Sequence, residues 1–226
     1  MSHDKQFTLY THIAGTNGWK VVFVLEELGL TYESKYLDFV KNEHKSPDHV
    51  ALNPNGRIPT LIDHANKDFV VWESNAILLY LVDKYDTTHK LSAEKLEDKV
   101  TQLQWLFFQA SGQGPYYGQA AWFMRQHPEK IPSAIERYRK ETFRVLGVLD
   151  GVLSKQEWLV GDKCTIADLS FITWNHFAIV SFGGDSDVNI EKDFPALFKW
   201  HNALTSRESV RKCLAERDAL LAAQSH

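Results

Sequence analysis

The stretch TLYTHIAGTNGWK, residues 8–20, is typical of a strand that runs through a turn into a helix. Many α/β proteins place a nucleophile or a phosphate-binding loop in such a turn. This turn has no cysteine or serine, and no lysine or arginine before Lys20. The polar groups nearest the predicted helix start are the hydroxyl of Thr16 and the amide of Asn17. Because Asn17–Gly18 also fits an ordinary turn that tolerates positive φ, the residues alone leave its role open.

A second candidate, Glu73–Ser74, lies in the stretch WESNAIL, where a predicted strand meets a predicted helix. Free N–H groups, the helix dipole and the Ser74 hydroxyl together suit a carboxylate. Glu73 could bind a cation on the same ligand, so a ligand with an α-amino and an α-carboxylate group would satisfy both residues. The alternative is a plain serine N-cap beside an acidic residue of the first turn.

The stretch NPNGRIPTLID, residues 53–63, carries further candidates. Arg57, with His44 and Lys45, flanks the same strand ends and could hold a second carboxylate, or lie on a solvated surface. Pro59 can donate no ladder hydrogen bond and belongs where a loop enters a strand. A cis Ile58–Pro59 bond would turn the Ile58 backbone toward a ligand, but only about 5–6% of X–Pro bonds in folded proteins are cis. The residues alone therefore favour a trans bond.

The elements that must position these residues alternate over the first half of the chain. We predict strands over residues 7–11, 31–39, 58–63 and 69–73, and helices over residues 18–30, 46–53 and 74–85. The order βαβ followed by ββα gives a small mixed sheet with helices on its faces. Beyond a polar linker at residues 86–94 the apolar pattern is helical, with a break or kink at SGQGP, residues 111–115. We therefore predict an α/β domain over residues 1–85 and an all-helical domain over residues 95–226.

Composition excludes several classes of function. The 226 residues include 25 Lys and Arg against 29 Asp and Glu, with no basic stripe for a nucleic acid. No apolar run approaches the roughly 18 residues that span a membrane, and the start does not resemble a signal peptide. Cys164 and Cys213 provide neither a disulfide framework nor the spacing of a metal site. We predict a cytoplasmic protein without a metal, a nucleic-acid partner or a membrane partner.

Taken together, the turn with Asn-Gly, NPNGRIPTLID and WESNAILLYL resemble the thioredoxin-like, glutathione-binding domain of cytosolic glutathione transferases. WLVGDKCTIADLSF, residues 158–171, is similar to the helix-starting signature of the family's helical domain, with Thr165 and Asp168 as a capping box. Within the family, the chain is similar to the branch of the fungal nitrogen-catabolite regulator and the bacterial Nu class. The resemblance runs from about Phe7 to about Arg217.

The resemblance implies glutathione as co-substrate and no metal. It assigns Asn17 to the sulfur of glutathione, and His44 and Arg57 to the glycyl carboxylate. It assigns Ile58, with a cis bond to Pro59, to the cysteinyl backbone, and Glu73 with Ser74 to the γ-glutamyl end.

An asparagine donor together with a helix N-terminus suffices to hold the sulfur as a thiolate. A thiol with a pKa of about 8.5 needs a shift of roughly two units, or about 2.7 kcal/mol, for the thiolate to dominate at neutral pH. A hydrogen bond to a charged group is worth about 1.5–3 kcal/mol, and a helix N-terminus adds about 0.3–1 kcal/mol. We predict Asn17 as the first donor and Thr16 as a second. Strand alternation turns Tyr10 to the opposite face of the sheet from Leu9.

The helical domain is expected to supply the pocket for the electrophile. Aromatic residues near the helix break suit flat, apolar compounds, although at least half of them are expected in the core: Tyr116, Tyr117, Trp122 and Phe123. The resemblance implies a homodimeric transferase acting on hydrophobic electrophiles, peroxides or mixed disulfides. The alternative is a non-catalytic regulatory or ligand-binding protein with the same fold.

Overall fold

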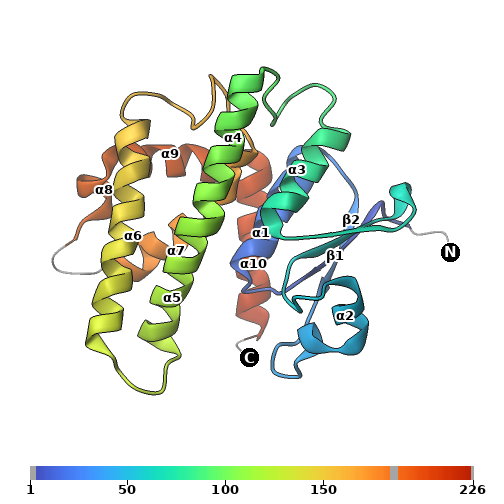
Figure 1. The fold of residues 1–226 in the computed structure, drawn as a ribbon, viewed down its shortest axis with the longest axis horizontal. Helices are drawn as coiled ribbons and strands as arrows, with labels where there is room; N and C mark the ends of the chain where they lie inside the picture. Colours follow the sequence, from blue (N-terminus) through green and yellow to red (C-terminus); the bar gives the residue numbers. More distant parts are fainter. Residues whose placement is uncertain (1–3, 184–187, 225–226) are drawn as a thin grey trace. The chain divides into compact units, whose positions relative to one another are not determined.

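The computed structural model describes residues 4–183 and 188–224, so the outermost residues of both predicted domains lie outside the described part. The chain divides into two compact units (Figure 1): unit 1 comprises Met1–Lys90 and Ser206–His226, and unit 2 comprises Leu91–Thr205. This division differs from the predicted one, because α10 (Glu208–Gln224) packs against α1 (Thr16–Glu27) within unit 1. A helical period shows which residues share a face and not which unit covers that face.

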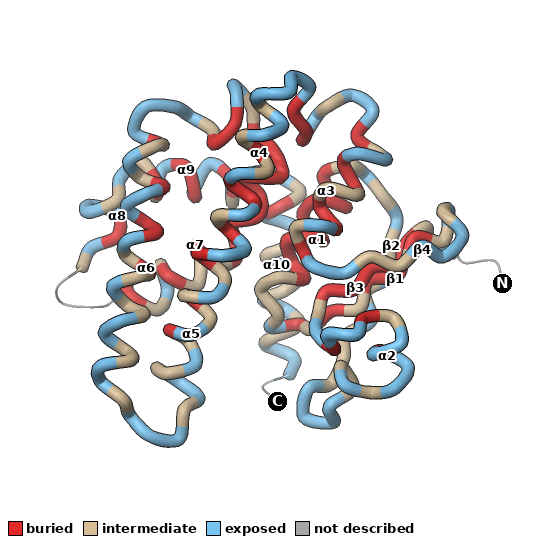
Figure 2. The backbone as a smooth tube through the Cα atoms, viewed as in Figure 1, coloured by how far each residue is buried: buried red, intermediate tan, exposed pale blue. Residues whose placement is uncertain are grey.

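Unit 1 is built on a four-stranded sheet in the order β2–β1–β3–β4. The strands are β1 (Phe7–Thr11), β2 (Tyr32–Tyr36), β3 (Thr60–Asp63) and β4 (Phe69–Trp72). β1 pairs parallel with β2 and antiparallel with β3, and β3 pairs antiparallel with β4. The mixed sheet and the thioredoxin-like order of elements are confirmed. Burial is concentrated in the central strands β1 and β3 (Figure 2).

Helices cover both faces of this sheet. α1 and α3 (Ser74–Tyr85) pack against each other. The Phe7 ring contacts Tyr85 of α3 edge-on, whereas Tyr10 contacts His49 of α2 (Pro47–Leu52). Positions 7 and 10 of a strand point to opposite faces, so α3 and α2 lie on opposite sides of β1. Tyr10 thus lies on the face opposite to that of Phe7 and Leu9, as predicted.

The end of β2 differs from the prediction for a local reason. The second strand ends at Tyr36, because Asp38 accepts hydrogen bonds from the N–H groups of Val40 and Lys41 and closes a turn there. Short 3₁₀ helices follow at Glu43–Lys45 and His64–Asn66.

Unit 2 consists of helices. They are α4 (Leu96–Phe108), the π-helical turn η3 (Gln109–Gln113), α5 (Gly114–Arg125), α6 (Pro132–Leu153), α7 (Ile166–Phe182), α8 (Ile190–Asp193) and α9 (Pro195–Thr205). Where a break or kink was predicted at SGQGP, a π turn joins α4 to α5 and the helix continues through it (Figure 1). Pro115 directly follows this turn, at the start of α5.

The predicted capping box starts α7 and anchors the core of unit 2. Thr165 accepts from the N–H of Ala167, and Asp168 accepts from the N–H of Thr165. Asp168 is fully buried and also accepts from the Leu159 N–H and from Nε1 of Trp200. The signature therefore has a structural role. Within the described residues, none of the helices combines the length and the apolar character needed to cross a membrane.

Candidate functional site

A cavity of about 390 Å³ opens in unit 1 at the N-terminal ends of α1 and α3 and the loop that enters β3. All the residues that the resemblance assigned to glutathione line it, except His44. They are Asn17, Arg57, Ile58, Pro59, Glu73 and Ser74, and Thr16 lines it as well. The structure thus brings together residues that are spread over nearly 60 positions of the chain.

Asn17 lies in the first turn of α1, which begins at Thr16 behind the N-cap residue Gly15. Gly15 has no side chain to cap the helix, so the first N–H groups of α1 meet no capping side chain. Asn17 and Gly18 have helical backbone, and the alternative of a turn with positive φ is wrong. Gly18 is required for another reason: a Cβ there would lie 1.9 Å from Oγ1 of Thr11. The glycine lets the helix start approach β1 and thereby sets the position of Asn17.

The start of α3 forms the opposite part of the wall. Glu73, and not Ser74, occupies the N-cap position, with φ at +69°, and its side chain makes no capping hydrogen bond. The Glu73 side chain is exposed on the cavity wall, and the buried Ser74 is the first residue of the helix. An acid and a hydroxyl therefore lie at the cavity beside the N-terminus of α3, an arrangement that suits an α-amino acid end.

Asn53, for which the sequence analysis predicted no role, holds the shape of the loop that enters β3. Its buried side chain donates to the Arg57 carbonyl at 2.9 Å and to Oγ1 of Thr60 at 3.0 Å. Its amide oxygen accepts from the N–H of Asn55 at 3.0 Å. Nε2 of His49 donates to the same Arg57 carbonyl. These bonds hold the segment that presents Arg57 and Ile58.

The Ile58–Pro59 bond is cis, as the family resemblance implied. Lys45 donates to the Asn55 carbonyl at 3.0 Å, so its ammonium supports the loop.

His44 does not line the cavity. Its ring packs on Phe39, with 4.3 Å between ring centroids, and Phe39 in turn packs on His12. Phe39 forms that part of the cavity wall. Burial and the nearby cations Lys45 and Arg57 lower the pKa of His44, which favours a neutral imidazole. Phe39 thus lines the cavity and His44 does not, and the contact of His44 with glutathione stays a prediction.

Lys20 is a second residue that the sequence reading left without a role. It lies on α1, is fully buried, and its Nζ donates to Oγ of Ser74 across 3.5 Å. Burial lowers its pKa to about 7, against the field of Glu73, which raises it. The signal was a charged residue inside the apolar run WKVVFVL.

The predicted electrophile residues all belong to unit 2 and differ in their surroundings. Tyr117 is fully buried, donates its hydroxyl to the Thr142 carbonyl, and has its pKa raised by burial. It is a core residue, and we leave it out of the proposed pocket. Tyr116 lies beside the Arg144 guanidinium, Phe123 stacks on Tyr138, and Trp122 is exposed.

Metal binding has no support in the described part of the chain, which contains no cluster of three or more His, Cys, Asp or Glu side chains able to hold an ion. Both cysteines are buried and form no disulfide.

Comparisons with known proteins agree with this geometry. Residues 5–83 match the model of the glutathione S-transferase N-terminal domain, and residues 115–208 match that of the C-terminal domain. The chain is 50% identical over 225 residues to glutathione S-transferase 1 of Schizosaccharomyces pombe, which covers 96% of this chain and 98% of that protein.

Solved structures extend the comparison. The glutathione transferase URE2P6 of Phanerochaete chrysosporium, in complex with oxidized glutathione, is 62% identical with a TM-score of 0.93 over 97% of this chain and 99% of that one. Ure2p5 of the same fungus, cocrystallized with 1-(S-glutathionyl)-2,4-dinitrobenzene, is 51% identical with a TM-score of 0.90 over 98% of each chain.

Proposed function

Because the chain belongs to the glutathione S-transferase family of enzymes, we propose that the cavity of unit 1 binds glutathione and that the bound thiolate attacks electrophiles. The observation that carries the proposal is the meeting of two helix N-termini, one with Asn17 and the other with Glu73 and Ser74, in one cavity. A thiol and an α-amino acid end are the two features of glutathione that such a pair of ends can recognise.

The tripeptide would be held by complementary charges along the cavity. Ser74 and the first N–H groups of α3 suit the γ-glutamyl carboxylate, and Glu73 suits the ammonium on the same carbon. The Ile58 backbone can pair with the cysteinyl peptide group. Arg57 suits the glycyl carboxylate, and His44, whose ring packs on Phe39 of the cavity wall, is the second residue that the resemblance assigns to it.

Asn17 is our candidate for the donor to the sulfur, with Thr16 as a second donor. Both line the cavity in the first turn of α1. Stabilisation of the thiolate by an amide and a helix end needs no general base, since the proton leaves to solvent. Because this turn has no cysteine, reduction of a peroxide or a mixed disulfide would also proceed through the sulfur of glutathione.

Aromatic electrophiles are the substrate class we favour. The conjugate bound by the related Ure2p5 carries a dinitrobenzene group, which supports that class. Tyr116, Trp122 and Phe123 remain the proposed contributors from unit 2.

A homodimer is part of the proposal. Leu96, Val100 and Phe107 of α4 are exposed by 70%, 54% and 70%. Their spacing places them on one face of the helix, which a second copy could cover. Sedimentation velocity tests this, and a monomer at micromolar concentration would contradict it.

A cytoplasmic location, supported by the absence of a disulfide between the two buried cysteines, is tested by cell fractionation.

Turnover is the decisive test of the function. Glutathione would be supplied with 1-chloro-2,4-dinitrobenzene, with a hydroperoxide and with a mixed disulfide, and glutathione binding would be measured in parallel by calorimetry. We expect binding together with conjugation of the aromatic electrophile. Binding with no turnover of any of the three would instead favour the regulatory or ligand-binding alternative.

A further inference from the structure

Lys20 is a buried cation beside the start of α3. Its side chain is 1% exposed and bridges from α1 to α3, two helices that pack against each other. Its Nζ lies 3.5 Å from Oγ of Ser74, which lines the cavity. A buried ammonium disfavours folding unless it is paired or hydrogen-bonded. A buried lysine whose hydrogen-bond partner Ser74 lines a binding cavity is a candidate for a role in that cavity.

The charges around Lys20 allow it to change protonation near neutral pH. On α3, Glu73 raises its pKa, while burial, the larger effect, lowers it to about 7. Arg207, which directly precedes α10, and Lys212 of α10 pair with Glu27 and Glu26 at the C-terminal end of α1. These two cations are therefore neutralised away from Lys20.

The protonation state of Lys20 determines what the Ser74 hydroxyl can do. An ammonium has three donors and no acceptor, so Ser74 can only accept from it and keeps its own O–H for another partner. A neutral amine can accept, and the Ser74 hydroxyl can then donate back to Lys20 instead of into the cavity. A carboxylate in the cavity needs the first arrangement, because it can only accept.

We propose that Lys20 is a positioning residue of the glutathione site, which in its protonated form directs the Ser74 hydroxyl toward the γ-glutamyl carboxylate and balances the charge of that carboxylate. The inference rests on the proposed function. Glutathione and a proton then bind together: the proton comes from solvent and is bound at Nζ of Lys20, and no bond of the ligand changes.

The test uses S-methylglutathione, whose blocked sulfur removes the titration of the thiol. Calorimetry at pH 6 and pH 8, in buffers with different ionisation enthalpies, yields the dissociation constant and the number of protons taken up. With a pKa of about 7, about a tenth of the molecules carry a protonated Lys20 at pH 8. We expect binding about tenfold weaker than at pH 6, together with uptake of most of one proton.

Variants separate this role from a structural one. Lys20→Met keeps a long side chain without the charge, and should weaken binding at pH 6 by about a hundredfold, near the upper end of the range for a lost hydrogen bond from a charged group, with no proton uptake at pH 8. Lys20→Arg keeps the charge at both pH values and should bind with a flat pH profile. Lys84→Met, which changes an exposed lysine of α3, should keep the wild-type profile.

The outcomes distinguish the two proposals. If wild-type protein fails to bind S-methylglutathione, the proposed function itself is overturned. If wild-type protein binds it but takes up no proton at pH 8, the role of Lys20 is overturned and the proposed function stands. The same holds if Lys20→Met shows the wild-type proton count. Since the wild-type proton count decides by itself, misfolding of a variant does not block the test.

Discussion

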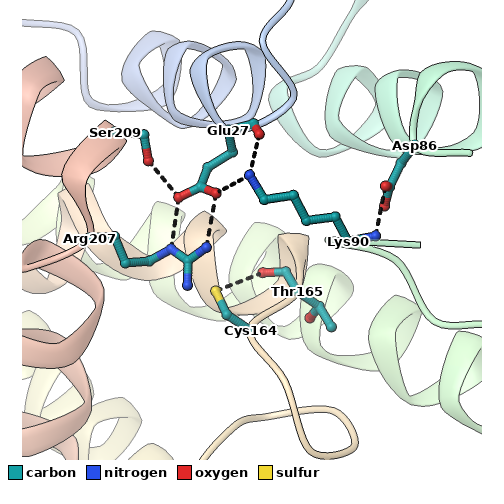
Figure 3. A network of polar contacts seen from close by, with 7 residues as sticks. All are labelled: Glu27, Asp86, Lys90, Cys164, Thr165, Arg207 and Ser209. Atoms are coloured by element: carbon teal, nitrogen blue, oxygen red, sulfur yellow. Dashed lines mark hydrogen bonds and ion pairs between the residues drawn. The ribbon is translucent and has the colours of Figure 1, made fainter. Parts of the chain in front are cut away.

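Glu27 and Arg207, 180 residues apart in the chain, form a bidentate ion pair inside unit 1. Nε of Arg207 donates to Oε1 of Glu27 at 2.8 Å, and Nη2 donates to Oε2 at 2.9 Å (Figure 3). Ser209 donates to the same carboxylate, and Lys90 pairs with it at 3.0 Å. Lys90 ends the first segment of unit 1 and Arg207 lies at the start of the second. One carboxylate at the end of α1 therefore ties together both places where the chain passes between units.

Replacing this carboxylate should destabilise unit 1. Glu27→Gln leaves Arg207 and Lys90 without their counter-ion at a side chain only 5% exposed, and breaking such a pair costs about 3 kcal/mol. Urea unfolding followed by circular dichroism measures the loss. The matched control is Glu136→Gln, whose partner Lys140 and own side chain are exposed and which should change stability little. Equal losses in both variants would contradict the role of the Glu27 network.

The Glu27 carboxylate should also make the free energy of unfolding depend on pH. Burial alone would raise the pKa of Glu27, but hydrogen bonds from Arg207, Ser209 and Lys90 outweigh it and lower the pKa to about 2. A carboxyl with a lowered folded-state pKa stabilises the fold above its unfolded pKa of about 4.5, and that contribution is lost as pH falls toward 2. The free energy of unfolding should therefore fall more steeply from pH 4.5 to 2 in the wild type than in Glu27→Gln. Parallel curves would show that the pair contributes nothing.

Asn17→Ala should raise the pKa of the glutathione thiol in the complex. Loss of one hydrogen bond to a thiolate, about 1.5–3 kcal/mol, corresponds to roughly one to two pKa units. The thiolate absorbance of the bound complex, titrated against pH, reports this value, and the pH profile of kcat/KM should shift with it. Thr16→Ala is the comparison. If it raises the pKa and Asn17→Ala does not, the assignment of the sulfur donor passes to Thr16.

Gly18→Ala should disturb the site through packing. The new methyl group would lie 1.9 Å from Oγ1 of Thr11, so the start of α1 must move away from β1 and carry Asn17 with it. We expect a lower melting temperature and weaker glutathione binding, measured by calorimetry. Gly151→Ala in α6 is the control, because nothing lies within 4 Å of its added methyl group. There the helix should gain up to about 1 kcal/mol. Unchanged melting and affinity in Gly18→Ala would contradict the close approach.

Much of the fold could be predicted because local rules agree with it. Alternation in FTLYT yields β1, and Thr165 and Asp168 form the predicted capping box. The boundaries that were missed depend on contacts outside the pattern. Ser74 was expected as the cap of α3, but Glu73 takes that position with a positive φ. The break or kink expected at SGQGP is a π turn that joins α4 to α5, with Pro115 directly after it.

By itself the sequence determined which chemistry is available: an amide at a helix start, an acid and a hydroxyl at another, and no nucleophile of the protein's own in the turn. Those features are local, since caps, turns and strand alternation depend on near neighbours in the chain. Tertiary structure alone decided which side chains face the cavity. It buried Tyr117 in unit 2, placed Phe39 where His44 was expected, moved α10 into unit 1 and set Lys20 against Ser74. Each of these four placements depends on which element packs on a given face. The pattern of residues along a helix or strand predicts which residues share a face, but not which element packs on it.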